Sequence, residues 1–433
     1  TMRNNIVHAG AHELQYEIRE IVAVGNCLKD MGLDVCWENI GDPVLKGEKI
    51  PSWIKDVIKG AVDNDSSFAY SPTKGLAETR AFLAEICNSR KKVQITEEDI
   101  IFFNGIGDAI SKVYNYLRKE ARVIGPSPAY STHSSTEAAH AGEDHIMYKL
   151  DPRNSWMPDI DDLRDKIIND KSISGILMIN PNNPAGTVYS KDVMEDIVRI
   201  AEEFDLFIVC DEIYLEITYN GKVSTPLSDV INGVCAISMR GISKELPWPG
   251  ARCGWIEVYN RENDPVFNTY IETILNAKML EVCSTTLPQT VIPSLLSDPR
   301  YKEYHSERNR QYEAKSKYAY DALVGVDGII VNRADGAFYM TVAFEDGALN
   351  NKQSLAITSD KVRAYIEDSV CNVALDKRFV YYLLGATGIC VVPLTGFSCD
   401  IFGFRVTLLE TDMLKFEWIF KTIAEKTKAY LNS

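Results

Sequence analysis

Two short polar motifs could take part in chemistry, and each directly follows a run of apolar residues. The first, at 180–186, reads Asn-Pro-Asn-Asn-Pro-Ala-Gly. Proline locks φ, so the two prolines fix the backbone and would aim an asparagine amide at a ligand. The second is Asp211-Glu212-Ile213-Tyr214. Taken alone, the first would be an ordinary turn and the second a solvated acidic loop.

Lys244 is the candidate nucleophile. It lies in a loop between two apolar runs, next to Ser243 and shortly before the segment 248–255, Trp-Pro-Gly-Ala-Arg-Cys-Gly-Trp. An amine that is partly removed from water has a lowered pKa and becomes nucleophilic. A loop lysine is otherwise a surface cation, so this interpretation depends on the apolar flanks.

A glycine-containing turn is the candidate anion site. The segment 105–109, Gly-Ile-Gly-Asp-Ala, follows the apolar run 100–103 and opens a predicted helix. The first N–H groups of a helix have no partner inside it and attract a phosphate. Such turns are frequent, so this motif is informative only together with the others.

The elements that must position these motifs form an α/β pattern. Short, continuously apolar runs alternate with helical stretches such as 190–203, and such runs are typical of strands buried on both faces of a mostly parallel sheet. Open sheets of this kind bind ligands at the carboxyl ends of their strands, which is where the motifs lie. The predicted strands are 100–103, 121–125, 145–148, 175–179, 206–210, 234–239 and 252–258.

The pattern changes after residue 299. A long charged helix is predicted at about 299–324, and a mixture of strands and helices follows it. We therefore expect a large domain at 46–300 and a smaller α+β domain made of 1–45 and 301–433. The predicted elements of the second part are a helix within 13–31, strands near 329–331, 337–344, 389–392 and 403–409, and helices near 358–371 and 411–430.

Composition excludes several classes of protein. The 433 residues carry a net charge of −15, which argues against nucleic-acid binding. Ten scattered cysteines and the pair His8 and His12 form no metal-ligand pattern, so we expect reduced thiols and no metal site. The uncharged stretch 379–399 is interrupted by glycines and a proline, so it predicts a helix end, a turn and a strand rather than a membrane span. Together with the absence of a secretory signal pattern, these features predict a cytoplasmic protein without a membrane partner.

Taken in order, the motifs resemble the class I/II aminotransferases among the fold-type I pyridoxal-phosphate (PLP) enzymes. The resemblance begins at 39–43, Asn-Ile-Gly-Asp-Pro, and 70–75, Tyr-Ser-Pro-Thr-Lys-Gly, and it ends at 404–406, Phe-Arg-Val. It implies the fold-type I architecture, with a seven-stranded, mostly parallel sheet in the large domain and a smaller α+β domain. It also implies that the cofactor is pyridoxal 5'-phosphate.

The resemblance assigns roles around the cofactor ring. Lys244 corresponds to the lysine that binds the cofactor as a Schiff base and then serves as general base and acid. Asp211 corresponds to the carboxylate that keeps the ring nitrogen protonated, because its charge raises that nitrogen's pKa. Asn183 and Tyr214 match the donors to the phenolic oxygen, and Tyr130 matches an aromatic ring stacked on the pyridine.

Phosphate-binding residues follow from the same resemblance. Tyr70 corresponds to a residue that reaches the phosphate of the neighbouring subunit, which implies a homodimer. Arg252 stands eight residues beyond Lys244, the spacing of the family. The implied phosphate ligands within the chain are Ile106, Gly107, Asp108, Ser243 and Arg252.

The substrate site implied by the resemblance centres on Arg405. Its guanidinium would hold the substrate α-carboxylate as a two-point fork, and Gly41 and Asn183 complete the implied substrate contacts. An ordinary strand arginine with a surface ion pair is the alternative. The segment 336–339, Gly-Ala-Phe-Tyr, matches the neighbouring small-domain strand of the family.

Two positions depart from the family pattern. Gly241 stands where relatives often carry a serine that contacts the phosphate, so Ser243 and Arg240 are the candidates to replace that donor. His133 stands where an aromatic residue is frequent, next to the cofactor wall, and is a candidate for tuning substrate choice.

We therefore predict an aminotransferase that exchanges an amino group between an L-α-amino acid and an α-keto acid in a ping-pong cycle. A PLP-dependent lyase acting on C–S or other β-substituted amino acids shares every anchor named above and is the alternative. A non-catalytic regulator built on this domain is disfavoured, because the chain before Gly41 offers one helix and no basic patch. The residues expected to line the pocket are apolar or neutral: Ile40, Ile106, His133 and Trp248. This weakly disfavours a strictly dicarboxylic amino acid as the donor, and the sequence does not identify the substrate.

Overall fold

The computed structural model describes residues 2–14 and 16–433. Its largest element is a sheet of eight strands in the order β2-β9-β8-β7-β6-β3-β4-β5. The strands are β2 (Ile100–Phe103), β3 (Arg122–Ser127), β4 (Met147–Asp151), β5 (Met157–Pro158), β6 (Ile173–Ile179), β7 (Phe207–Asp211), β8 (Ala236–Gly241) and β9 (Gly254–Tyr259).

The sheet confirms the predicted, mostly parallel α/β architecture. Six strands run in one direction, while β9 is antiparallel to β2 and β8, and β5 is antiparallel to β4. The expected count of seven strands is one too low. The additional strand β5 has only two residues, which is too short to stand out as an apolar run.

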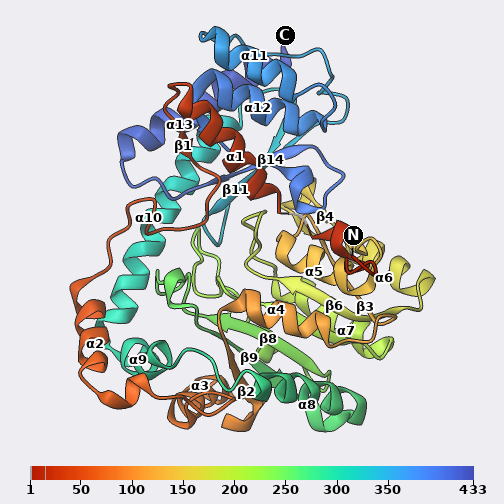
Figure 1. The fold of residues 1–433 in the computed structure, drawn as a ribbon, viewed down its shortest axis with the longest axis vertical. Coiled ribbons are helices and arrows are strands. Elements are labelled where there is room, and N and C mark those ends of the chain that lie inside the picture. The colour runs from red at the N-terminus through yellow and green to blue at the C-terminus, as the bar shows by residue number, and fades with distance from the viewer. Residues whose placement is uncertain (1, 15) are drawn as a thin grey trace.

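Both faces of this sheet are covered by helices (Figure 1). Alternate side chains of β2 enter different cores, as the two-residue period of a strand requires: Ile101 and Phe103 belong to one, Ile100 and Phe102 to the other. The first core includes residues of α4 (Ile106–Asn115) and α8 (Pro265–Leu280). The second includes residues of α2 (Ser52–Val62), α3 (Ala77–Asn88), α6 (Ile160–Asn169), α7 (Lys191–Glu203) and α9 (Thr286–Ser297). The helix α5 (Ser131–Ala141) follows β3 and lies beside α4.

A second layer of structure is built around a four-stranded antiparallel sheet, β10 (Ile329–Val331), β11 (Tyr339–Phe344), β14 (Gly403–Thr407) and β13 (Val392–Pro393). The N-terminal part of the chain joins it, because β1 (Cys36–Trp37) pairs with β12 (Ile389–Cys390), and α1 (Glu17–Asp30) contributes to the same core. The division of the chain into a large domain at 46–300 and a small domain made of 1–45 and 301–433 stays a prediction. The helices of this part are α10 (Pro299–Leu323), α11 (Asp360–Ser369), α12 (Leu375–Thr387) and α13 (Met413–Leu431).

The uncharged stretch 379–399 has the predicted structure. Helix α12 ends at Gly388, which has φ +79°, and two short strands follow. A Cβ at Gly388 would lie 1.9 Å from the Asp34 carbonyl oxygen, so this turn requires glycine. Among the described residues, no helix has both the length and the apolar character needed to cross a membrane. All ten cysteines are free thiols.

Candidate active site

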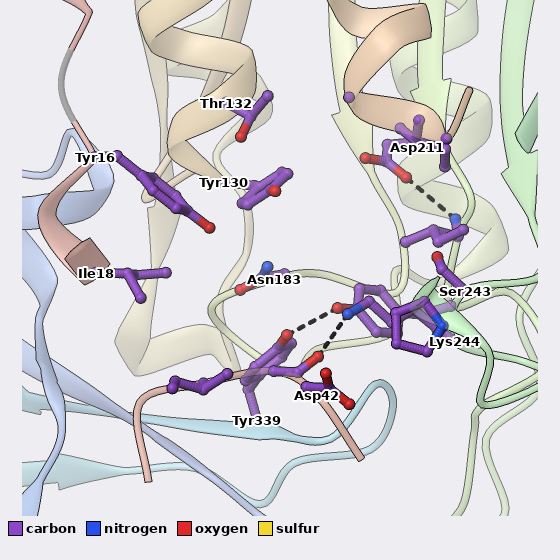
Figure 2. Close-up of a pocket in the computed structure, with 18 of the residues that line it drawn as sticks. Tyr16, Ile18, Asp42, Tyr130, Thr132, Asn183, Asp211, Ser243, Lys244 and Tyr339 are labelled. Atoms are coloured by element: carbon purple, nitrogen blue, oxygen red, sulfur yellow. Dashed lines mark hydrogen bonds between the residues drawn. The ribbon is translucent and has the colours of Figure 1, made fainter. Parts of the chain in front are cut away.

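One cavity of about 430 Å³ collects most of the predicted site residues (Figure 2). It lies at the carboxyl ends of the parallel strands, because Tyr130, Asn183 and Asp211 follow or end β3, β6 and β7, and Lys244 follows β8. Its lining includes these predicted residues: Gly41, Ile106, Gly107, Tyr130, Asn183, Asp211, Tyr214, Ser243, Lys244, Arg252 and Arg405.

Lys244 projects its amine into this cavity. Its Nζ donates to the Gly41 carbonyl oxygen at 2.5 Å and lies 5.6 Å from the centre of the Phe338 ring. Burial lowers the pKa of the Lys244 amine to about 8, and the positive charges of Arg405 and Arg252 act in the same direction while Asp42 opposes them. An appreciable fraction of the amine is therefore neutral and nucleophilic near pH 8.

Asp211 lies at the end of the cavity opposite Tyr339 in the view of Figure 2. The side chain is 3% exposed, and its Oδ1 accepts from the Ile213 N–H at 3.1 Å. Its Oδ2 lies 2.9 Å from His133 Nε2, and His133 Nδ1 lies 3.0 Å from the Tyr114 hydroxyl. A carboxylate only accepts hydrogen bonds, so Nε2 donates and the chain Tyr114–His133–Asp211 holds the carboxylate in place.

Arg405 forms the anchor on the opposite wall. It is 1% exposed, its Nη1 donates to Asn183 Oδ1 at 3.0 Å, and its Nη2 donates to the Asn39 carbonyl oxygen. Its guanidinium lies 4.3 Å from the centre of the Tyr339 ring. Among the described residues, no hydrogen-bond partner is found for its Nε or for either polar atom of the Asn39 amide. Within 2–14 and 16–433, no carboxylate forms a salt bridge with Arg405, so a buried cation faces the cavity without a counter-ion.

Tyrosine hydroxyls line the cavity between these anchors. The Tyr214 and Tyr339 hydroxyls are 2.9 Å apart. Burial raises the pKa of Tyr214 well above its usual value, so its phenol keeps its proton and can donate at neutral pH.

The predicted anion site lies where α4 begins. Gly105 precedes the helix with φ +83°, and a Cβ there would lie 2.7 Å from Arg252 Nη2, so glycine lets this guanidinium approach the turn. Arg252 is exposed and borders the cavity together with Ser243, Ile106 and Gly107. Two residues of the first helical turn, a hydroxyl and a guanidinium thus line the same cavity and could bind a phosphate there.

Comparisons with known proteins show which family the chain belongs to. The model of aminotransferase class I and II matches residues 38–415. The chain belongs to the class I and II aminotransferases. It is 58% identical over 432 residues to an uncharacterized aminotransferase of Methanocaldococcus jannaschii, covering 100% of both chains. It is 30% identical over 318 residues to a glutamate–pyruvate aminotransferase of Haemophilus influenzae, covering 72% of this chain and 76% of that protein.

A solved structure is similar over almost the whole aminotransferase chain. The alanine aminotransferase of Pyrococcus furiosus superposes with a TM-score of 0.82 at 26% identity, covering 98% of each chain. The predicted recognition of the family, the fold and the assignment as a transferase enzyme are therefore confirmed.

The residues of this aminotransferase fit the cofactor that its family implies. The cavity offers an amine of lowered pKa for the aldehyde, a buried carboxylate at Asp211 for the ring nitrogen, and backbone and cationic donors for the phosphate. The turn at Gly105 also keeps free the space that a Cβ would fill. Among the described residues, no cluster of three or more His, Cys, Asp or Glu side chains that could hold a metal ion is found.

Two predicted cofactor contacts lie outside the cavity. Tyr70 is 82% exposed, so its proposed contact belongs to a partner subunit and stays a prediction. Asp108 turns its carboxylate away from the cavity, where it accepts from the Asn104 N–H at 3.0 Å and pairs with Lys112. The side chain therefore supports the turn, because helix geometry at the third position of α4 points it back along the chain, and a cofactor contact of Asp108 through its backbone N–H stays a prediction.

The two departures from the family pattern are explained by position. His133 does not line the cavity but is fully buried behind Asp211, so it is corrected from a substrate-tuning residue to a positioning one. A Cβ at Gly241 would lie 3.0 Å from Ile213 Cδ1, which leaves little room for a serine. Arg240 cannot replace that donor, since it faces a separate cavity beside Glu245. Of the expected pocket residues, Ile40 and Ile106 line the cavity and Trp248 does not.

Sequence reasoning missed several residues on the substrate side. Tyr16, Ile18 and Arg19 reach the cavity from the start of α1, and Thr132 and Tyr339 also line it. The motifs gave no signal for the α1 residues, because the resemblance begins only at 39–43, after α1. Tyr339 had been recognised as part of a strand motif without a role in the site.

Proposed function

We propose that this aminotransferase carries pyridoxal phosphate on Lys244 and exchanges an amino group between an L-α-amino acid and an α-keto acid by a ping-pong cycle. The observation that carries this proposal is the combination of groups in one cavity. It holds an amine whose pKa is lowered to about 8 and a buried guanidinium without a counter-ion. A substrate carboxylate would supply the missing counter-ion, and its amino group would then lie on the side of Lys244.

When bound, the cofactor supplies a ring that withdraws electrons from the substrate and stores its amino group. The protein's own groups do the rest. Once the substrate amine has displaced it from the cofactor, the Lys244 amine would take and later release the proton of the substrate α-carbon as general base and acid. Asp211 would hold the protonated ring nitrogen, Asn183 and Tyr214 the phenolic oxygen, and Arg405 the substrate α-carboxylate.

The substrate pair that we propose is glutamate with pyruvate. The name of the Haemophilus influenzae relative gives that pair, and the Pyrococcus furiosus structure is an alanine aminotransferase. Arg19 supports glutamate in particular, because it is an exposed arginine that lines the same cavity as Arg405 and could meet a side-chain carboxylate. This differs from the weak expectation against a dicarboxylic donor, which was based on the residues recognised in the sequence.

A homodimer is part of the proposal. Tyr70 is 82% exposed and Phe68 is 76% exposed, which is unusual for neighbouring aromatic side chains. In a dimer that covers these side chains, Tyr70 of one subunit would lie near the phosphate site of the other subunit. Light scattering should give twice the mass of the chain, and Tyr70→Phe should weaken PLP binding without changing that mass.

The proposed function is tested by incubating the PLP-loaded enzyme with glutamate alone and then with pyruvate. We expect one equivalent of 2-oxoglutarate and loss of the visible cofactor band, followed by alanine and recovery of the band. Release of ammonia and pyruvate from cysteine, with no amino form of the cofactor, would instead identify a lyase.

The role of Arg19 can be tested within the same assay. Arg19→Gln should lower kcat/KM for glutamate about tenfold to a hundredfold, the range expected for a charge-assisted hydrogen bond, and leave alanine nearly unchanged. Lys29→Gln, also an exposed cation of α1, is the matched control. An equal loss for both amino acids in Arg19→Gln would refute the glutamate assignment.

A further inference from the structure

Arg308 on α10 is a buried arginine whose five N–H groups are all directed at protein acceptors. Its side chain is 4% exposed. Its Nη1 donates to the Lys244 carbonyl oxygen at 2.7 Å and to the Glu245 carbonyl oxygen at 3.2 Å. Its Nε and Nη2 both donate to the Glu48 carboxylate, and Nη2 lies 3.5 Å from the Tyr312 hydroxyl. One side of the guanidinium therefore holds the backbone of the reacting lysine.

The backbone that Arg308 holds is an irregular segment. Residues 242–248 lie between the end of β8 and a short 3-10 turn at Pro249–Ala251, and they form neither helix nor strand. Carbonyl groups in such a segment lack the regular partners of secondary structure and need other donors. A rigid, forked guanidinium can fix two successive carbonyls at once, which a single ammonium cannot.

Glu48 fixes the other side of the guanidinium. Besides Arg308, its carboxylate accepts from the Tyr304 and Tyr312 hydroxyls, each at 3.3 Å. Glu48 ends the loop 41–48, and its own N–H donates to the Pro43 carbonyl oxygen at 2.9 Å. The carboxylate is thus tied to the loop on one side and to α10 on the other.

The same loop also touches the tip of Lys244. The Gly41 carbonyl oxygen accepts from Lys244 Nζ at 2.5 Å, so the lysine is held at both ends by the loop 41–48, directly at its amine and through Arg308 at its backbone. Helix α10 crosses in Figure 1 from the large sheet toward the helices of the small sheet. Arg308 and Glu48 therefore connect the loop 41–48, α10 and the segment that carries Lys244.

We propose that Arg308 and Glu48 form a clamp that positions Lys244 for proton transfer. This inference rests on the proposed function, since it takes Lys244 as the reacting amine. The clamp fixes where the amine points and leaves the substrate carboxylate to Arg405. Losing it should therefore reduce kcat, whereas KM should change little.

The charges around Lys244 give the clamp a second measurable effect. Arg308 adds to the positive charges that lower the pKa of Lys244, so its removal or displacement should raise that pKa. The charged groups that act on the amine are Asp42, which raises its pKa, and Arg405, Arg252 and Arg308, which lower it.

The experiment compares Arg308→Lys, Arg308→Gln and Glu48→Gln with the control Arg310→Gln. Arg310 is two residues further along the same helix, and its exposed side chain pairs with Glu307. In the cofactor-free proteins, reductive methylation of Lys244 is followed by peptide mass spectrometry from pH 6 to 10, with the exposed Lys222 as internal standard. In the loaded proteins, kcat and KM are measured with the best amino-acid donor.

We expect Arg308→Gln to slow methylation of Lys244 at pH 7.5 at least about threefold relative to Lys222. We expect Arg308→Lys to lower kcat about tenfold to a hundredfold, the scale of a misplacement near 1 Å, with KM within about threefold. Arg310→Gln should match the wild type in both measurements.

Folded Arg308 variants with wild-type kcat and a wild-type methylation profile would overturn the proposal, and so would a loss confined to KM. Glu48→Gln keeps the size of the side chain, and it tests the proposed clamp if the Arg308 variants do not fold. It should lower kcat with unchanged KM, and wild-type kcat in that variant would overturn the proposal. If the wild type transfers no amino group, the proposed function fails, while the methylation profiles still show whether the clamp positions Lys244.

Discussion

The two walls of the active-site cavity are built differently. The wall around Asp211 comes from strand ends of one sheet, and both carboxylate oxygens already have protein partners. The wall around Arg405 combines the small sheet with the N-terminal segment, and among the described residues the Arg405 Nε and the buried Asn39 amide next to it have no hydrogen-bond partner. Protein donors already hold the carboxylate of the first wall in place, and it keeps free lone pairs for a ligand, whereas the second wall has polar atoms with no partner among the described residues. We infer that the first wall fixes the cofactor chemistry and the second selects the substrate.

The strongest test of the first wall is Asp211→Asn. Because the amide cannot keep the ring nitrogen protonated, kcat should fall about 10³-fold, the scale for loss of a preorganised electrostatic group, while the cofactor still binds. Turnover and cofactor titration measure the two effects. The control Asp205→Asn changes an exposed aspartate shortly before β7. A near-normal rate for Asp211→Asn would show that this wall does not control the chemistry.

The second wall is tested by Arg405→Lys, which keeps the charge but loses the fork. We expect kcat/KM to fall about 10²-fold for every amino acid alike, because the α-carboxylate is common to all of them. Rates with several amino acids measure this. A loss confined to one side chain would place Arg405 in the side-chain pocket instead and would break the proposed division between the walls.

The pH dependence of cofactor capture tests the amine between the walls. The pKa of Lys244 is lowered from 10.5 to about 8, so the reactive neutral fraction of the amine falls steadily as the pH drops below that value. Stopped-flow mixing of cofactor-free protein with PLP should give a capture rate that rises about tenfold per pH unit below pH 8 and levels off above it. A rate that keeps rising to pH 10 would mean that the cavity leaves the amine unperturbed.

The contrast between the walls also explains what the sequence could predict. Asn183, Asp211 and Lys244 lie at or just after the ends of apolar runs, and strands of a parallel sheet bring their carboxyl ends together, so the local pattern predicted that these residues lie near one another. Their roles were implied by the family resemblance. The short strand β5 was not predicted, because two residues are too few to form a recognisable apolar run.

Other features depend on contacts that sequence order does not contain. The position of His133 behind Asp211 depends on how α5 packs, and the approach of Arg19 depends on the docking of α1 against a distant part of the chain. Neither leaves a periodic signal in the sequence. The direction of the Asp108 side chain could not be predicted for a related reason: the resemblance identified the helix turn, while the direction of that side chain follows from helix geometry.

The central claim is that Lys244 bonds the cofactor, and chemical trapping tests it most directly. The PLP-loaded enzyme is reduced with borohydride, digested, and mapped by mass spectrometry. We predict a single phosphopyridoxyl group, on the peptide that contains Lys244, and none on that peptide in Lys244→Ala. A modification on another lysine, or a loaded enzyme in which no lysine is modified, would contradict the account.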